Sequence, residues 1–265
     1  MQEKVGLFVS RNVLSDVAYN ELKIMGFIPV AFSFGTKLGY PEEVVLDFGD
    51  IEGFGRQIAK CRIRKLVFAG KIEPSALFKK RISDSGRIFL EGIRNLNPEN
   101  ILKSLVSFFL EKKIELIPLT KVFRRHIAKT KIYTESGPDS DQWKDICAGW
   151  KAAKAIARCG IGQAVAIKNG MIIGVEAIEG TDNMIKRAGN FCDGFSVIKV
   201  IKSGQDVRFD LPTIGPDTIR NLARAGGRVI AVESNRAIIL EQQKTKKIAN
   251  KNHIIVLGFK GKEIR

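Results

Sequence analysis

The sequence has 265 residues, 45% of them hydrophobic and 27% charged, which is ordinary for one large globular domain or two small ones. No apolar run approaches the roughly 20 residues of a membrane-spanning helix, and no signal peptide is recognisable, so we expect a protein that is soluble or at most attached to a membrane surface. The formal net charge of +16 favours nucleic acid, anionic membranes or phosphorylated metabolites as partners, although a genome-wide lysine bias would give the same value.

The first half of the chain alternates short apolar runs with segments of helical periodicity. Strands are expected at Val5–Ser10, Ile28–Phe34, Lys65–Ala69 and Ile114–Ile117. Helices are expected at Leu14–Met25, at Ile51–Cys61, and from Pro98 to about Lys113 after the capping residue Asn97. This alternation predicts a parallel sheet covered by helices, and we expect a Rossmann-like domain over residues 1–130.

The second half has a different pattern and follows a connector at about 121–140. Asn169-Gly170 between Ala164–Lys168 and Met171–Ile178 is the strongest short-range signal for a hairpin. A second hairpin is expected from Val229–Glu233 and Ala237–Leu240. The other expected elements are a strand at Ser196–Ile201 and helices at Ser140–Arg158, Asp182–Ala188 and Pro216 to about Gly226. The predicted fold class is therefore α/β with two domains, the second being an α/β domain with hairpins over residues 135–265.

Zinc and nicotinamide sites find no support in the sequence. No cysteine–histidine cluster has zinc spacing, and the cysteines form no CxxC pair, so we expect buried, reduced thiols. The first turn after a strand, Val9–Ser15, lacks the glycines of a dinucleotide-binding fingerprint. The turn after the third strand is a better place for substrate, because Gly70 allows close backbone approach and Lys71 offers positive charge.

Acidic side chains gather unexpectedly in Val175–Asn183 of this basic chain. Glu179 and Asp182 are expected on the turn into a helix, where backbone N–H groups and the helix dipole favour anions. Together with Glu176, they can hold a divalent cation against a phosphate. The alternative is that Thr181 and Asp182 cap the helix and Glu179 is solvated, and spacing alone favours that alternative modestly.

A second candidate site is the long polar loop at residues 199–216. Asp206, Arg208 and Asp210 alternate, so in an extended chain they would share one face and could combine metal binding with phosphate clamping. The alternative is a surface ion pair of little energetic value. A further apolar segment, Ile101–Lys113, is either a core helix, which we favour, or a surface that meets acyl chains or the bilayer interface.

Several of these segments resemble the LpxI-type UDP-2,3-diacylglucosamine pyrophosphatases. Glu176–Ile185 and Lys199–Thr218 are similar to the two signature blocks of that family. Phe68–Lys71, Gly162–Ile167 and Ile230–Ser234 are similar to further family segments, so the resemblance covers nearly the whole chain.

The resemblance implies hydrolysis of UDP-2,3-diacylglucosamine to UMP and 2,3-diacylglucosamine 1-phosphate (lipid X), a step of lipid A biosynthesis in Gram-negative bacteria. It implies dependence on Mg²⁺ and attack of water on the β-phosphorus. It further implies a cytoplasmic protein with a lipid-linked nucleotide sugar as substrate and transient contact with the inner-membrane surface. We expect no nucleic acid partner, and a homo-oligomer remains open.

The expected site residues are transferred by their positions in the matching segments. The catalytic candidates are Asp206, Asp210 and Glu179. The metal-binding candidates are Glu176, Asp182, Asp206 and Asp210. The substrate-binding candidates are Gly70, Lys71, Gln163, Thr181, Lys199, Arg208 and Thr213.

One segment departs from the family pattern. The family has a glycine-rich turn after its first strand, where this chain has Ser10–Leu14. This departure leaves a non-catalytic nucleotide-sugar-binding protein as one alternative to the enzyme. The net charge leaves a nucleic-acid-binding protein as another, although no basic-aromatic motif supports it.

Overall fold

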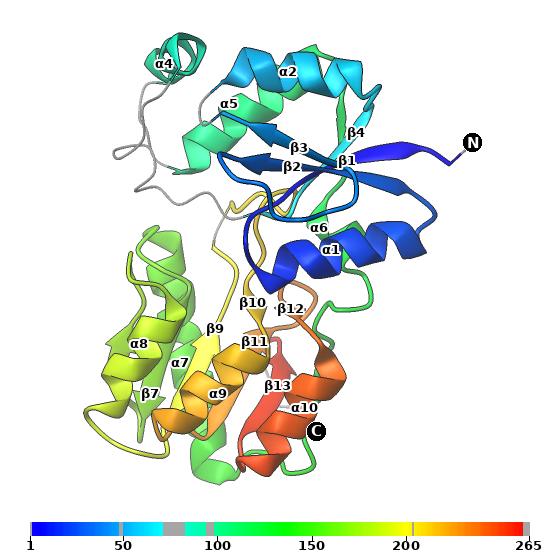
Figure 1. Ribbon diagram of the computed structural model, residues 1–265. Helices are drawn as coiled ribbons and strands as arrows, with labels where there is room; N and C mark the ends of the chain where they lie inside the picture. The colour runs from blue at the N-terminus through cyan, green and yellow to red at the C-terminus, as the bar shows by residue number, and fades with distance from the viewer. Residues whose placement is uncertain (1, 48–49, 71–82, 94–97, 203, 262–265) are drawn as a thin grey trace. The chain divides into compact units, whose positions relative to one another are not determined.

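The computed structural model of the chain describes residues 2–47, 50–70, 83–93, 98–202 and 204–261. The chain divides into two compact units (Figure 1). Unit 1 comprises Met1–Phe123 and Asp206–Asp210, and unit 2 comprises Arg124–Gln205 and Leu211–Arg265. The expected α/β fold with two domains is confirmed. One segment differs from the expected division, because residues 206–210 of the second block belong to the N-terminal unit.

Unit 1 contains an entirely parallel five-stranded sheet of order β3-β2-β1-β4-β5. The strands are β1 (Lys4–Phe8), β2 (Ile28–Phe34), β3 (Glu43–Leu46), β4 (Lys65–Phe68) and β5 (Glu115–Leu116). The predicted parallel sheet is confirmed, with β3 as an additional edge strand. The strand order reverses between β1 and β4, and such a switch point opens a crevice at the carboxyl ends of the strands.

Helices cover both faces of this sheet (Figure 1). They are α1 (Val13–Ile24), α2 (Ile51–Lys60), α4 (Asp84–Glu91), α5 (Pro98–Glu111) and α6 (Leu119–Val122). The face under α2 and α5 holds a core rich in phenylalanine, in which the ring of Phe54 lies 5.3 Å from Phe32 and 5.2 Å from Phe109. Helix α5 buries Ile101, Leu105 and Phe109 there, which confirms the core interpretation of this helix. Its expected capping residue, Asn97, lies outside the described residues.

Unit 2 contains a mixed sheet of order β6-β13-β11-β9-β7-β8. The strands are β6 (Lys131–Ile132), β7 (Ala164–Lys168), β8 (Met171–Val175), β9 (Ser196–Lys199), β11 (Val229–Glu233) and β13 (Ile255–Phe259). The three central strands, β13, β11 and β9, are parallel, and the outer strands are antiparallel to their neighbours. The first predicted hairpin is confirmed as β7–β8, and its turn residues Asn169 and Gly170 both have positive φ, as a two-residue turn of this type requires.

The second predicted hairpin is wrong. Strand β11 pairs with β9 and β13, whereas β12 (Ile238–Ile239) pairs with β10 (Thr213–Ile214) in a separate two-stranded sheet. Residues 229–232 are buried throughout, which is typical of a central parallel strand with both faces covered. After the turn, Asn235 N–H donates to the Ala128 carbonyl at 2.7 Å, so the chain leaves β11 instead of folding back on it.

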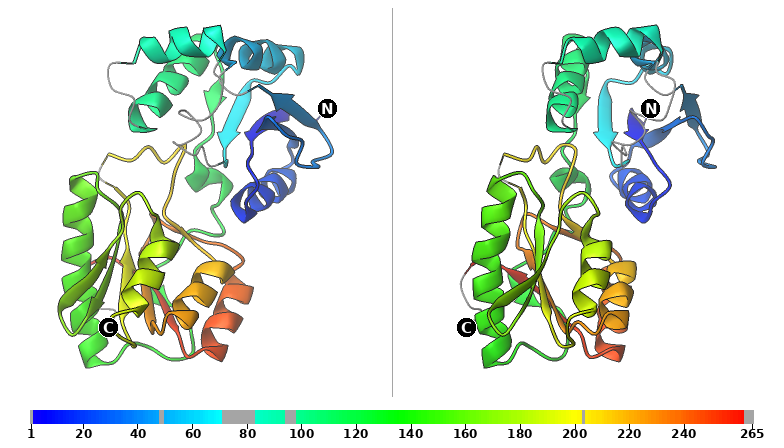
Figure 2. Two further views of the ribbon diagram at one scale, coloured as in Figure 1. Left: turned by 60° about the vertical axis from the view of Figure 1, so that its left-hand side comes forward. Right: turned by 90° about the vertical axis from the view of Figure 1, so that its left-hand side faces the viewer.

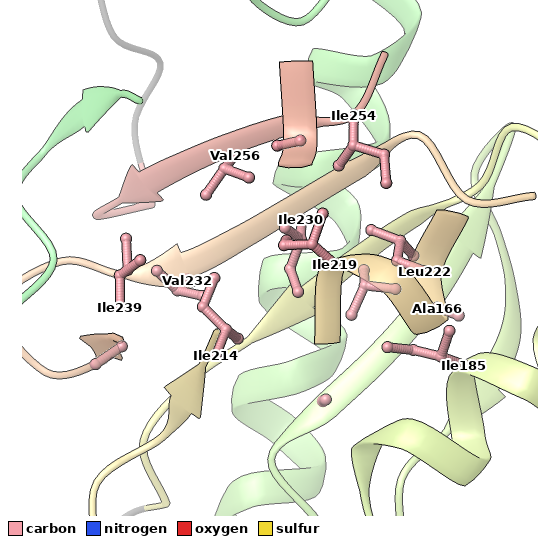
Figure 3. Packing of buried hydrophobic residues seen from close by; sticks show 14 of the residues in the cluster. Ala166, Ile185, Ile214, Ile219, Leu222, Ile230, Val232, Ile239, Ile254 and Val256 are labelled. Atoms are coloured by element: carbon pink, nitrogen blue, oxygen red, sulfur yellow. The ribbon is translucent and has the colours of Figure 1, made fainter. Parts of the chain in front are cut away.

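The helices of unit 2 form two layers around its sheet (Figure 2). Helix α7 (Ser140–Arg158), with the predicted bounds, packs on one face. Helices α8 (Thr181–Gly189), α9 (Pro216–Arg224) and α10 (Gln242–Lys251) cover the other face. Figure 3 shows the aliphatic packing beneath them, where Ile219 and Leu222 of α9 meet Ile230 of β11. The parallel centre of the sheet is thus buried on both sides, and its carboxyl edge remains for chemistry.

Two further expectations are tested by exposure and hydropathy. All four cysteines are free, but none is buried: Cys159 is exposed and Cys61, Cys147 and Cys192 are half-buried, so the expectation of buried thiols is wrong. Across the described parts of the chain, no helix combines the length and apolar character needed to span a bilayer.

Candidate active site

Hydrogen bonds hold the ends of β1 and β4 close together at the switch point of unit 1. Ala69 N–H donates to the Phe8 carbonyl at 3.1 Å, and the Ser15 hydroxyl donates to the Ala69 carbonyl at 2.9 Å. A Cβ on Gly70 would lie 2.9 Å from the main-chain carbon of Val9, so glycine is required for this approach. The neighbouring candidate, Lys71, lies outside the described residues.

The segment 206–210 forms a turn in unit 1. Phe209 N–H donates to the Asp206 carbonyl at 3.0 Å, and Leu119 N–H donates to the Val207 carbonyl at 3.0 Å. Phe209 is buried, with its ring 4.9 Å from that of Phe68 at the end of β4. The chain is not extended here, as a shared face of Asp206, Arg208 and Asp210 would require; the tight turn lets Phe209 reach the apolar core. The turn is thereby fixed beside the carboxyl end of β4.

Asp206 and Arg208 form a bidentate ion pair within this turn. Arg208 Nε donates to Asp206 Oδ1 at 2.9 Å, and a terminal guanidinium nitrogen donates to Oδ2 at 2.6 Å. Burial acts to raise the pKa of Asp206, but the hydrogen bonds from the Arg208 side chain and backbone outweigh it and hold that pKa below its usual range. Asp206 therefore stays ionised and orients the guanidinium, while Asp210 is exposed at the end of the turn.

Glu176 lies at the end of β8 in unit 2 and is only 6% exposed. Its carboxylate accepts the Thr181 hydroxyl at 2.8 Å and Gln163 N–H at 3.2 Å. Gly162 packs directly against the Glu176 main chain. Thr181 is the first residue of α8 and Gly180 the N-cap, so the expectation that Thr181 caps this helix with its side chain is wrong: its hydroxyl serves Glu176 instead.

Glu179 and Asp182 have different surroundings on the same turn. The Arg187 guanidinium donates to Glu179 Oε1 at 2.7 Å, and Ala177 N–H donates to Oε2 at 3.1 Å. The hydrogen bond from Arg187 is the main cause of the lowered pKa of Glu179. Asp182 is exposed in the first turn of α8. Glu176 and Glu179 are thus engaged by protein donors, whereas Asp182 faces solvent.

Lys199 and Thr213 lie at the two ends of the loop that follows β9. The Lys199 ammonium is buried and donates to the Thr213 carbonyl at 3.1 Å, so it joins the start of the loop to its end. Just beyond, Gly215 precedes Pro216 at the start of α9, as expected. The structure therefore brings together Glu176, Thr181 and Gln163, then Lys199 and Thr213, and in unit 1 Asp206 and Arg208.

One charged residue at the carboxyl edge of the sheet in unit 2 was not among the predicted site residues. Glu233, at the end of β11, accepts Lys154 Nζ at 2.5 Å and Ile201 N–H at 3.0 Å. The available signal was an acidic residue closing a buried parallel strand, but the expectation of a hairpin at this point obscured it.

Metal binding depends on how carboxylates are grouped. No three His, Cys, Asp or Glu side chains within the described residues are grouped to hold a metal ion. Asp206 and Asp210, however, lie in one turn of unit 1 and present hard oxygen ligands. Mg²⁺ commonly takes one or two carboxylates and completes its shell with water and substrate phosphates. The two acids of this turn are ligands of that type, although both oxygens of Asp206 already accept from Arg208.

Comparison with known proteins decides the family. Residues 22–126 match the model described as the LpxI N-terminal domain, and residues 129–257 match the LpxI C-terminal domain. The chain belongs to the LpxI family. It is 32% identical over 135 residues to the UDP-2,3-diacylglucosamine pyrophosphatase LpxI of Caulobacter vibrioides, a match that covers 48% of each protein. This chain thus spans about half the length of that curated relative.

Proposed function

We propose that this LpxI-family chain hydrolyses the pyrophosphate of UDP-2,3-diacylglucosamine to UMP and 2,3-diacylglucosamine 1-phosphate. The observation that carries the proposal is the match of both LpxI domain models along almost the whole chain, together with the relative that bears the name of this pyrophosphatase. The proposed reaction is a step of lipid A biosynthesis in which water attacks the β-phosphorus.

The turn at 206–210 supports this chemistry. Arg208, held by Asp206, presents a fixed positive charge to phosphate oxygens, and the charge that develops during hydrolysis needs such donors. With its lowered pKa, Asp206 is a weak base, which favours Asp210 as the group that orients the attacking water and receives its proton.

Asp206 and Asp210 are the residues proposed to hold Mg²⁺ in unit 1. When bound, the ion would polarise a phosphoryl oxygen and neutralise part of the pyrophosphate charge. Both oxygens of Asp206 accept from the Arg208 guanidinium, so this carboxylate would serve the arginine as well as the ion. The ionised state of Asp206 at neutral pH supports both tasks.

Unit 2 has candidate phosphate contacts of its own. The start of α8 beyond Gly180 and that of α9 beyond Gly215 carry main-chain N–H groups suited to phosphate. The internal bonds of Thr181 and Lys199 favour a role in shaping these segments, unless substrate displaces those bonds. Glu176 and Glu179 are likewise bound by protein donors, so they shape these segments unless substrate displaces those bonds. Asp182 faces solvent as a candidate ligand.

The protein's surroundings follow from this substrate. We propose a cytoplasmic enzyme that makes transient contact with the anionic inner-membrane surface, where a lipid-linked nucleotide sugar resides. The net charge of +16 supports such contact, because basic side chains are attracted to anionic headgroups.

The test is release of UMP from UDP-2,3-diacylglucosamine in detergent micelles, with and without Mg²⁺. Asp210→Asn and Asp206→Ala should each lower kcat about 10²–10³-fold, as expected when a group that stabilises charge or water is removed. Asp84→Asn is the matched control, because Asp84 is an exposed acid that pairs with an arginine, Arg87, on helix α4.

The outcomes separate the alternatives. No UMP release from folded wild-type protein would refute the enzyme and leave a nucleotide-sugar-binding protein. UMP release that needs Mg²⁺ and survives in both variants would support the activity. It would refute the catalytic role of the 206–210 turn.

A further inference from the structure

The loop between β9 and β10 leaves unit 2 after Gln205 and returns to it at Leu211. The segment that carries Asp206 and Asp210 therefore begins after the carboxyl edge of the sheet in unit 2. Within unit 1 the turn is held by Phe209 and Leu119, and within unit 2 the two ends of the loop are held separately. One side chain at this edge binds the departing main chain and lies outside the proposed set of substrate ligands.

That side chain is Glu233. The ladder between β9 and β11 ends with the pair Lys199 and Val232, so Ile201 lies beyond the regular strand pairing. Glu233 follows Val232, the last residue of β11 that pairs with β9, and uses one carboxylate oxygen, Oε2, to accept Ile201 N–H at 3.0 Å. The side chain thus continues the attachment of the departing chain after the ladder has stopped.

Lys154 holds Glu233 in this position from helix α7. Its ammonium donates to the same oxygen at 2.5 Å and lies 5.1 Å from the centre of the Trp150 ring. The side chains of Glu233 and Lys154 are 14% and 27% exposed, so the pair is partly shielded from water. Hydrogen bonds to an ionised carboxylate in such surroundings are stronger than bonds between neutral groups.

We propose that Glu233, oriented by Lys154, is a positioning residue for the start of the loop that carries the 206–210 turn, a role that rests on the hydrolysis proposed for this chain. Glu233 reaches the reaction through the Ile201 main chain. Together with the bond from Lys199 to the Thr213 carbonyl, it fixes both ends of the loop in unit 2.

The experiment combines kinetics with amide hydrogen exchange. Glu233→Ala should speed exchange at Ile201 about tenfold, because a hydrogen bond to a charged group is lost. It should lower kcat for UMP release about 10–100-fold, as expected when reacting groups shift by a fraction of an ångström to one ångström. KM should change less than about threefold, since the substrate ligands themselves remain.

Two conservative variants and one control separate positioning from general stability. Glu233→Gln retains an oxygen that can accept Ile201 N–H, and Lys154→Met retains the carboxylate, so both should fall between wild type and Glu233→Ala. Asp145→Asn is the control, because Asp145 is a buried carboxylate that binds main-chain N–H groups at the opposite edge of the same sheet. It should lower stability while leaving kcat and exchange at Ile201 unchanged.

The two readouts fail in different ways. Unchanged exchange at Ile201 in Glu233→Ala overturns the inference, whether or not the protein is active. Faster exchange with wild-type kcat overturns the positioning role and leaves a structural bond. No UMP release from wild type refutes the proposed function and the kinetic half of the inference with it, and exchange alone then decides whether Glu233 holds the loop.

Discussion

The two sheets of this protein support functional segments in different ways. In unit 1, the 206–210 turn is held by an aromatic side chain, since Phe209 is buried against Phe68, and by a main-chain bond from Leu119. In unit 2, the corresponding edge is held by charged side chains that bind main-chain atoms, namely Lys199 and Glu233.

The contrast shows two solutions to the problem of placing polar loops at the end of a parallel sheet. Apolar anchoring is non-directional and depends on volume, so it should respond to cavities. Anchoring by buried charges is directional, and it fails sharply when one partner is removed, because the other partner is left unsatisfied. The following substitutions test this difference, beginning with the largest expected effect.

Phe209→Ala should destabilise unit 1 by about 3–5 kcal/mol, the usual cost of emptying a buried phenylalanine site. Hydrogen exchange should increase in the strands of unit 1 and remain near wild type in those of unit 2. Phe191→Ala is the control, because this phenylalanine is 67% exposed in unit 2. Equal loss of protection in both units would contradict the assignment of Phe209 to the core of unit 1.

Gly162→Ala should destabilise unit 2 by about 1–3 kcal/mol, a typical cost of overpacking. A Cβ at this position would overlap the Glu176 carbonyl oxygen, so the segment that follows β8 and carries Glu176 must shift. Thermal unfolding measures the effect. Gly92→Ala is the control, since a Cβ there meets only atoms at 3.5 Å or beyond. A wild-type midpoint for Gly162→Ala would show that the two segments separate without cost.

Asp145→Ala should cost about 1 kcal/mol, because two main-chain N–H groups of the β7–β8 turn lose their acceptor while remaining near solvent. Chemical denaturation with Asp141→Ala as the control provides the measurement. Asp141 is exposed on the same helix and pairs with Lys144, so its removal should change stability by less than about 0.5 kcal/mol. Equal effects of the two substitutions would refute the role of Asp145 in the turn.

The smallest expected effect is the pH dependence of the pair formed by Asp206 and Arg208. The pKa of Asp206 is lower in the folded protein than its usual value of about 3.9, so ionisation favours folding. This contribution is fully present above about pH 4 and is lost as pH falls through the lowered pKa. The stability difference between wild type and Asp206→Asn should therefore shrink in acid, and a difference that is independent of pH would contradict it.

Local signals in the sequence were sufficient for much of the fold. The strand Ile28–Phe34 and the helix Ser140–Arg158 were predicted with their observed bounds, because periodicity and caps define them locally. The hairpin at Asn169-Gly170 followed from the conformation that this dipeptide favours. The strands that pair with β11 could not be predicted, because pairing depends on which strands are neighbours in space. The turn residues between Glu233 and Ala237 indicate a turn but not which strand β11 pairs with.

The candidate site was predictable as residue types and less so as geometry. The acids at 176–182 and 206–210 were recognised from their pattern, but alternation suggested an extended chain where the structure has a turn. The decisive residue was Phe209, whose apolar side chain among charged neighbours could not reveal which core receives it. The role of Thr181 was likewise decided by Glu176, a non-local choice between capping a helix and binding a carboxylate.

The insertion of residues 206–210 into unit 1 also has a consequence for biosynthesis. The N-terminal part of unit 1 ends at Phe123, yet its aromatic core needs Phe209. Phe209 lies 86 residues beyond Phe123 in the sequence. At about 5–20 residues per second, the ribosome needs roughly 4–17 seconds to synthesise them. The core of a nascent unit 1 therefore stays incomplete while residues 124–205 of unit 2 are synthesised. During this interval, a chaperone that covers exposed phenylalanines would have its greatest effect on the yield of folded protein.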